Sequence, residues 1–186
     1  MAIYIALLRG INVGGKNKIK MADLKCSMEA IGLCHVKTYI QSGNVLFESN
    51  EGEELLRKKI EQKIEEDFGL SINVILRTAS ELEWILQNCP FSKERIAEAE
   101  STSEGESLYV SMMTQIPAQE KIDKLSKYKS EGDEYKIVGR EIFLLFSHSI
   151  RNSKLANNLQ KLEVPATVRN MNTISKLVML ANAMKE

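Results

Sequence analysis

The apolar residues of this 186-residue chain fall into segments of two periods, and the order of these segments constrains the fold most strongly. Short alternating or continuous apolar runs predict strands, whereas apolar residues spaced three or four apart predict helices. In the first half, strands are expected at Ile3–Leu8, on both sides of the turn Gln41–Asn44, and at Ile72–Leu76. Helices are expected near Met21–Ile31 and at Glu51–Phe68. This order of elements defines a ferredoxin-like unit.

The same order recurs in the second half of the chain. Apolar runs predict strands at Leu108–Met113, on both sides of Gly139-Arg140, and at Thr167-Val168. Helical spacing follows Pro117 and recurs over Leu155–Leu162, and a last helix should begin after a cap at Asn172 or Thr173. The predicted fold is therefore α+β, with two tandem ferredoxin-like (βαββαβ) halves plus a C-terminal helix.

The predicted division of the chain follows from this repeat. Residues 1–90 form the half that carries a Gly-rich loop, and residues 107–186 form the second half with the C-terminal helix. Between them, residues 91–106 are rich in Glu, Ser, Ala and Lys and lack an apolar period. Such a composition predicts a charged, mobile linker that is helical at most in part.

Composition excludes several classes of protein. No stretch approaches the roughly 20 apolar residues that cross a membrane, and the apolar N-terminal run is too short for a signal peptide. Three cysteines without CxxC spacing predict free thiols, which suit the cytoplasm. The two histidines are far apart in sequence, so neither a metal nor a cofactor is expected.

The charge of the chain is balanced overall but unevenly distributed. Residues 1–47 carry six basic and two acidic side chains, and so do residues 147–186, which gives each end a net charge of +4. Residues 48–106 carry a net charge of −8. If the two ends meet in space, they form a positive face that suits an anionic partner. The other interpretation is that the acidic middle is only a solvated helix and linker.

The Gly-rich loop after the first strand is the main site candidate. Residues 10–17 match the phosphate-loop pattern GxxxxGK[ST] except at Asn17, where the Mg²⁺-binding hydroxyl is missing. The loop is also separated from the next helix by three residues, so an ATPase or GTPase is not expected. Two interpretations remain: an anion nest of the loop glycines, including Gly14 and Gly15, with Lys16, Lys18 or Lys20 nearby, or a tight turn over the sheet.

Two further polar segments lie near turns or helix starts. Ser42-Gly43-Asn44 suits either a hairpin turn or a binding loop. Arg169 precedes the last helix, where a bidentate donor beside a helix N-terminus suits a carboxylate or phosphate. No pair of residues stands out as a catalytic acid and base.

Several motifs resemble those of a known family. Residues 4–15 (YIALLRGINVGG), residues 20–24 (KMADL) and residues 38–45 (TYIQSGNV) closely resemble the bacterial family catalogued as domain of unknown function 1697. Residues 153–155 and residues 167–173 are similar to its C-terminal motifs, although Met171 stands where the family has Trp. The resemblance implies ferredoxin-like repeats and a cytoplasmic bacterial protein. It implies no reaction, but it groups the three polar segments as motif positions.

The leading hypothesis is a binding module for an anionic, phosphate-bearing ligand, either a nucleotide or nucleic acid, at one composite site. The alternatives are an enzyme that acts on a small anionic metabolite and a protein–protein interaction or assembly module. The sequence does not choose between binding and catalysis, and it leaves the oligomeric state open, with no membrane partner expected. The candidate ligand-binding residues are Arg9, Asn12, Gly14, Gly15, Lys16, Ser42, Asn44, Arg169 and Asn170.

Overall fold

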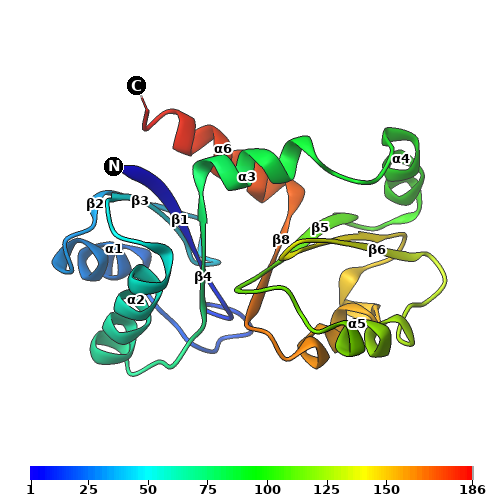
Figure 1. Cartoon of the computed structure of the whole chain (residues 1–186), viewed down its shortest axis with the longest axis horizontal. Coiled ribbons are helices and arrows are strands. Elements are labelled where there is room, and N and C mark those ends of the chain that lie inside the picture. The colour runs from blue at the N-terminus through cyan, green and yellow to red at the C-terminus, as the bar shows by residue number, and fades with distance from the viewer. Residues whose placement is uncertain (186) are drawn as a thin grey trace. The chain divides into compact units, whose positions relative to one another are not determined.

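A computed structural model describes residues 1–185, which divide into two compact units. Unit 1 contains Met1–Ile85 and the residues from Ser175 onward, and unit 2 contains Leu86–Ile174. The C-terminal helix, which the sequence analysis assigned wholly to the second half, therefore begins in unit 2 and continues in unit 1. Figure 1 shows the elements of both units along the chain.

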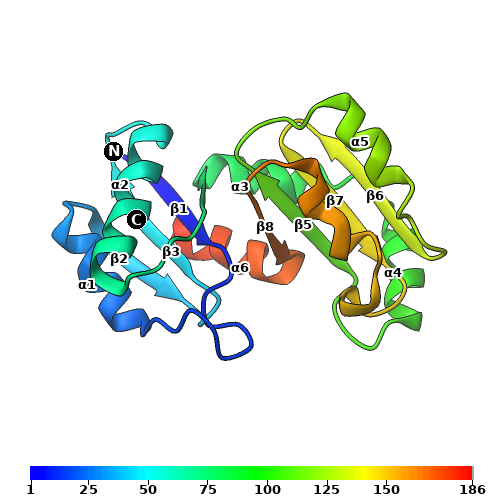
Figure 2. The same cartoon turned by 90° about the horizontal axis from the view of Figure 1, so that it is seen from below.

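Unit 1 is built on an antiparallel sheet. Its strand order is β2-β3-β1-β4, and each neighbouring pair is antiparallel. Helices α1 and α2 lie on the same face of this sheet (Figure 2). The elements are β1 (Ala2–Leu8), α1 (Met21–Ala30), β2 (Cys34–Tyr39), β3 (Asn44–Ser49), α2 (Glu53–Phe68), β4 (Val74–Thr78) and α3 (Ala79–Gln87).

The apolar periods of the sequence account for the core of unit 1. Leu56, Ile60 and Ile64 recur every four residues along α2, and all three are fully buried against the sheet. Gly69 ends this helix in the left-handed conformation, with φ of 65°, as expected for a residue that follows a helix. Deeply buried Ala6 and Leu8 of β1 join the same apolar cluster.

Unit 2 repeats this arrangement of strands. Its sheet has the order β6-β7-β5-β8, again with antiparallel neighbours. The elements are α4 (Lys93–Thr102), β5 (Leu108–Met113), α5 (Gln119–Ser126), β6 (Asp133–Val138), β7 (Glu141–Phe146), the 3₁₀ helices η1 (Ile150–Asn152) and η2 (Ala156–Leu162), β8 (Ala166–Asn170) and α6 (Met171–Asn182). The structure thus contains two four-stranded antiparallel sheets with the same strand order.

The registers of the two sheets also correspond. In unit 1, Ile5 of β1 lies opposite Arg77 of β4. In unit 2, Val110 of β5 lies opposite Arg169 of β8. In both units the last strand is followed directly by a helix, α3 after β4 and α6 after β8. Equivalent positions in the two units can therefore be compared residue by residue.

The segment expected to be a linker contains a regular helix. Helix α4 begins after Ser92, whose side chain accepts a hydrogen bond from the backbone N–H of Arg95 at 3.1 Å. Arg95 also forms an ion pair with Glu134 of β6, and Ala99 is fully buried. Because this helix packs through one small residue and an ion pair, it has no apolar stripe for sequence analysis to detect.

The helix expected over Leu155–Leu162 is present as the 3₁₀ helix η2 (Ala156–Leu162) rather than as an α-helix, and a second 3₁₀ helix, η1, precedes it. Asparagine side chains explain the difference, because they bind backbone carbonyls locally and compete with the α-helical pattern. Asn157 Nδ2 donates to the carbonyl of Arg151, and Asn158 Nδ2 donates to that of Lys154 at 2.7 Å. The apolar spacing is still used, since Leu155 and Leu162 are buried.

Candidate functional site

The Gly-rich loop that follows β1 forms a miniature hairpin. The backbone N–H of Lys16 donates to the carbonyl of Val13 at 3.0 Å, and the two residues form an isolated β-bridge. Gly14 and Gly15 occupy the tip with φ of 57° and 75°. Positive φ at both central positions is typical of a type I′ turn, which requires Gly or Asn. The tight-turn interpretation thus accounts for both glycines, and the Lys16 side chain is exposed at the tip.

Asn12 closes the base of this loop with its side chain. Its Nδ2 donates to the carbonyls of Ile19 and Gln41, both at 2.9 Å, and its Oδ1 accepts from the N–H of Ile19 at 2.9 Å. One amide therefore joins both ends of the loop to the β2–β3 hairpin. Since all these partners belong to the protein backbone, the Asn12 side chain holds the loop in place.

The Ser-Gly-Asn segment is packed beneath the loop. The carbonyl of Gly43 accepts from the N–H of Leu8 at 2.8 Å, and Gly43 has φ of 82°. A Cβ atom at this position would lie 2.6 Å from the Ile11 side chain and 2.9 Å from Leu8 Cβ. Asn44 is fully buried, and its Nδ2 donates to Tyr39 O and Ser42 Oγ, each at 3.0 Å. Gly43 and Asn44 thus shape the hairpin.

Backbone strain occurs beside this hairpin. Ile40 has φ of 49° although its side chain is β-branched, and about half of that side chain is exposed. A left-handed conformation costs a non-glycine residue roughly 1–2 kcal/mol. Ile40 directly precedes Gln41, whose carbonyl receives the Asn12 amide. The strained residue therefore adjoins the point where loop and hairpin are joined.

A cleft of about 860 Å³ lies along the loop in unit 1. This volume falls within the range of roughly 300–1,000 Å³ found for small-molecule sites. Its walls come from the loop, from Gln41, from the first turn of α1 and from Phe68 at the end of α2. The lining residues are Asn12, Gly15, Lys18, Ile19, Lys20, Met21, Ala22, Asp23, Gln41 and Phe68.

The first turn of α1 leaves backbone donors available to this cleft. The N-cap position is Lys20, and no side chain caps the helix. The first N–H groups of a helix have no intrahelical partner, and the helix dipole places positive charge there. Lys18 and Lys20 line the same space, and neither forms an ion pair within residues 1–185. Asp23 is the one carboxylate among the lining residues described, and its charge opposes an anion.

The sequence analysis placed Lys18 and Lys20 near the loop, but its list of candidate ligand-binding residues contains only Lys16 of the three lysines. Lys16 followed the phosphate-loop pattern, but it stands at the exposed tip of the miniature hairpin and is not among the residues that line the cleft. Arg9 is also exposed, and its backbone N–H donates to the Asn73 carbonyl at 3.0 Å. A signal for Lys18 and Lys20 was present, because a helix that starts without Ser, Thr, Asp or Asn leaves its N-terminus open.

Arg169 and Asn170 belong to unit 2 and are held by their own strand and helix. The Nη1 of Arg169 donates to Thr167 Oγ1 at 2.8 Å and to the Val168 carbonyl at 2.9 Å. The side chain is 9% exposed, and burial lowers its pKa to about 10. A single site that joins these residues to the Gly-rich loop stays a prediction.

The cap of α6 differs from the one expected. Asn170 Oδ1 accepts from the Thr173 N–H at 2.7 Å, so Asn170 is the cap and the prediction of Asn172 or Thr173 was wrong. The helix begins at Met171, two or three residues earlier than a cap at Asn172 or Thr173 would place it. Asn172 instead donates to both carboxylate oxygens of Glu106, at 2.8 and 2.9 Å.

Residues 1–185 contain no group of three or more His, Cys, Asp or Glu side chains that could hold a metal ion. The three cysteines of this part of the chain, Cys26, Cys34 and Cys89, are free thiols. No helix in the described range combines the length and apolar character needed to cross a membrane.

Comparison with known proteins finds a family and a structural relative. A family model described as protein of unknown function (DUF1697) matches residues 1–143. The chain is also similar to the solved structure of the conserved bacterial protein SP0830 from Streptococcus pneumoniae, with a TM-score of 0.73 and 26% sequence identity. That similarity covers 97% of this chain and 98% of the other. No curated protein matches.

Proposed function

Because the chain belongs to the DUF1697 family of proteins of unknown function, we propose a function from its own geometry: a cytoplasmic binding module for a nucleotide-sized, phosphate-bearing ligand. The site is the cleft beside the Gly-rich loop in unit 1. The observation that carries this proposal is the uncapped N-terminus of α1, whose first turn lines the cleft together with Lys18 and Lys20. Helix N-termini bind phosphate groups through their free N–H groups and dipole.

The rest of the cleft suits the apolar part of such a ligand. Ile19, Met21 and Phe68 line it together with the polar groups. Small-molecule sites are commonly apolar surfaces with a few well-placed polar groups. A nucleotide combines an apolar ring with an anionic phosphate, so it matches both parts of the lining. Inorganic phosphate alone would need only a small polar cavity, whereas this cleft is larger and partly apolar.

In this proposal the predicted site residues have different roles. Gly14, Gly15, Asn12 and Gln41 fix the wall of the cleft, and Ser42 and Asn44 hold the hairpin behind it. Arg9 and Lys16 are exposed and contribute long-range positive charge. Arg169 and Asn170 would join the site only if their unit contributes to it, which is a separate prediction.

We also propose that each unit is a ferredoxin-like repeat and that the chain arose by tandem duplication. The support is the strand order β2-β3-β1-β4 in unit 1 and the matching order β6-β7-β5-β8 in unit 2. In both, the first and third strands are antiparallel neighbours at the centre of the sheet. This is the arrangement of the split βαβ unit.

The test of function is calorimetric titration at low salt with adenosine monophosphate, adenosine and inorganic phosphate. We expect the nucleotide to bind most tightly and adenosine to bind at least about tenfold more weakly, since a charged hydrogen bond contributes roughly 1.5–3 kcal/mol. The double variant Lys18→Ala/Lys20→Ala should bind the nucleotide at least about tenfold more weakly than the wild type does, because each lost charged hydrogen bond contributes roughly 1.5–3 kcal/mol.

The matched control is Lys25→Ala on the same helix. Lys25 is half-exposed, pairs with Glu29 at 3.7 Å, and does not line the cleft. The affinity of the Lys25→Ala variant for the nucleotide should equal that of the wild type. Equal affinity for adenosine and its monophosphate, or no effect of the double variant, would remove the cleft from the account. Short RNA and DNA titrated in the same way distinguish a nucleotide from a nucleic-acid ligand.

A further inference from the structure

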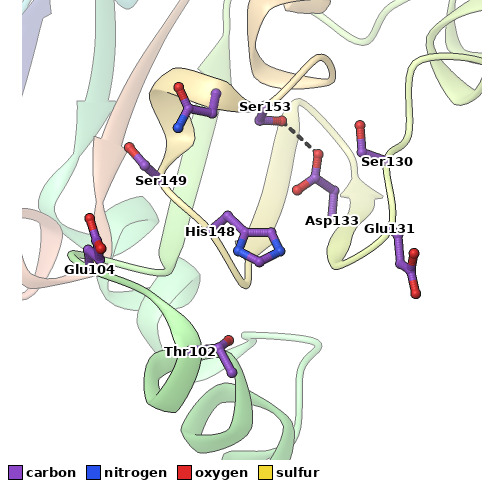
Figure 3. Close-up of a pocket in the computed structure, with 9 residues that line it drawn as sticks. Thr102, Glu104, Ser130, Glu131, Asp133, His148, Ser149 and Ser153 are labelled. Carbon is purple, nitrogen blue, oxygen red and sulfur yellow. Dashed lines mark hydrogen bonds between the residues drawn. The ribbon is translucent and has the colours of Figure 1, made fainter.

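A second hollow lies in unit 2, at the end of the sheet where β6 begins and β7 ends. It has a volume of about 370 Å³ and is lined by polar side chains (Figure 3). None of the candidate residues from the sequence analysis belongs to it. The lining residues are Thr102, Glu104, Ser130, Glu131, Asp133, His148, Ser149, Asn152 and Ser153.

The segments that form the walls of the hollow pack closely against one another. Gly132 has φ of 84°, and a Cβ atom there would lie 3.2 Å from Ser147 Cβ. The N–H of Ser147 donates to the Gly132 carbonyl at 3.1 Å, which joins the loop before β6 to the segment after β7. Thr102 Oγ1, at the end of α4, donates to the Ser147 carbonyl at 3.0 Å. Three segments distant in sequence are thus fixed around one space.

Asp133 is the central group of this hollow. The residue is 4% exposed, and its Oδ2 accepts from Ser153 Oγ at 2.7 Å. Within residues 1–185, this bond from Ser153 is the one side-chain hydrogen bond to the Asp133 carboxylate, and it leaves the other oxygen, Oδ1, as an acceptor. Figure 3 shows this second oxygen on the side of the hollow where His148 lies. A buried carboxylate with one free acceptor stabilises a ligand that brings a positive charge and a donor.

Other charges around the hollow have the same sign. Glu104 and Glu131 lie on the rim, and helix α4 ends at Thr102, so the negative end of its dipole faces this space. No lysine or arginine is among the lining residues described. The hydroxyl groups of Ser130 and Ser149 and the amide of Asn152 add both donors and acceptors.

From this arrangement we propose that unit 2 contains a separate binding site for a small organic ammonium ion that carries hydroxyl groups, such as an amino sugar. The ammonium group donates to Asp133 Oδ1, and the hydroxyl groups of the ligand bond to the serine, threonine and asparagine side chains. The volume lies near the lower end of the range of roughly 300–1,000 Å³ for small-molecule sites, so one sugar ring is the expected size. A metal ion is a poorer match, because residues 1–185 hold no cluster of metal-ligating side chains.

The test uses ¹H–¹⁵N spectra of the whole chain titrated with glucosamine, and with glucose as the uncharged analogue. We expect glucosamine to shift the amide signals of Gly132, Asp133 and Ser149, and glucose at the same concentration to shift none of them. Ethylamine, which lacks hydroxyl groups, should bind more weakly than glucosamine. Absence of a glucosamine response, or an equal response to glucose, would overturn the proposal.

Variants locate the charge that recognises the ligand. Asp133→Asn should weaken glucosamine binding about tenfold or more, because the buried charge is lost while the shape is kept. Glu104→Gln on the rim should weaken it a few-fold, and Glu100→Gln, on the exposed face of α4, should leave it unchanged. If Asp133→Asn does not give the native spectrum, the glucosamine affinity of Glu104→Gln becomes the test. An unchanged affinity in Glu104→Gln would then contradict the assignment of the site.

Discussion

Strands β1 and β5 occupy the same place in their sheets, but the connections that follow them differ in length and content. After β1, residues 9–20 form the miniature hairpin and reach α1, whereas after β5 only residues 114–118 precede α5. The cleft of unit 1 lies beside the longer connection, and the hollow of unit 2 lies at the start of β6. The comparison shows that the two units share a sheet, while their hollows lie beside different connections.

The two buried arginines show what the units share. Arg77 and Arg169 hold the same position in β4 and β8, and each donates from Nη1 to the carbonyl of the residue before it, at 2.7 and 2.9 Å. Thr78 and Asn170 then begin the next helices by accepting from a backbone N–H. The same residue at the same position in a unit without the Gly-rich loop indicates that this arginine belongs to the repeat. Arg169 is therefore a weaker candidate for ligand recognition than Lys18 or Lys20.

The largest effect on stability is expected at the glycines of the two hairpin turns. Comparing them separates the cost of a packing clash from the cost of a positive φ angle. Gly43→Ala places a Cβ atom against Ile11 and Leu8 at positive φ, so it should lower the free energy of unfolding by about 3 kcal/mol or more. Gly139→Ala, in the matching β6–β7 turn, has φ of 60° but no atom within 4 Å of the added Cβ, and should cost about 1 kcal/mol. Urea unfolding followed by circular dichroism measures both. Equal losses would show that the loop does not pack on the hairpin as described.

A smaller loss is expected from removal of the Asn12 side chain. Asn12→Ala deletes three hydrogen bonds at a residue with φ of 53°, and should cost about 2–3 kcal/mol. Asn17→Ala is the matched control, because Asn17 has φ of 48° but its side chain donates once, to the Gly10 carbonyl. It should cost about 1 kcal/mol. The same urea experiment applies, and a control as damaging as Asn12→Ala would contradict the role given to Asn12.

Relief of strain gives the next prediction, with the opposite sign. Ile40→Gly removes the cost of a β-branched residue at φ of 49°, and should raise the free energy of unfolding by up to about 1 kcal/mol. Its side chain is half-exposed, so little packing is lost. Thermal unfolding measures the change. A clear loss of stability would mean that the Ile40 side chain makes contacts that outweigh the strain.

The smallest effect concerns Tyr109 of β5, which occupies the position that Tyr4 holds in β1. In unit 2, burial raises the pKa of Tyr109 above its ordinary value, and the charge of Glu106 adds to this, while Arg151 opposes it. A raised pKa in the fold means that the stability from neutral Tyr109 is complete below the unfolded pKa of about 10 and is lost as pH rises through the folded value. Tyrosinate absorbance of wild type and Tyr109→Phe measures this. A difference spectrum that titrates at or below the ordinary value would contradict the burial of Tyr109.

Sequence patterns predicted the sheets better than the site. The apolar periods located all eight strands in order, because buried strands and the α2 stripe depend on residues close in sequence. They did not locate α4 within the predicted linker, because this helix packs through Ala99 and an ion pair. They predicted a helix at η2 but not its 3₁₀ form, in a region where asparagines bind backbone carbonyls. The repeat of Arg77 and Arg169 was visible only after the registers of the two sheets were known.

The site was harder to predict because glycines and asparagines serve both turns and ligands. Gly14, Gly15 and Asn12 are explained by the loop itself, and Lys16 is exposed and does not line the cleft. Lys18 and Lys20 were named beside the loop, but what favours them over Lys16 is the uncapped start of α1, which depends on where the helix begins. The hollow around Asp133 joins residues from three separate segments, and of its lining only Ser153 belongs to a motif that the sequence analysis named.

The most direct test of the proposed function is a map of the ligand on the backbone of the intact protein. ¹H–¹⁵N spectra are recorded during titration with adenosine monophosphate and, separately, with adenosine. The account predicts that the nucleotide shifts the amide signals of Met21, Ala22 and Asp23, which lie at the open start of α1, together with that of Gln41. Adenosine should leave the α1 signals nearly unchanged. Shifts confined to other parts of the chain, or none at all, would contradict the assignment of the phosphate site to this cleft.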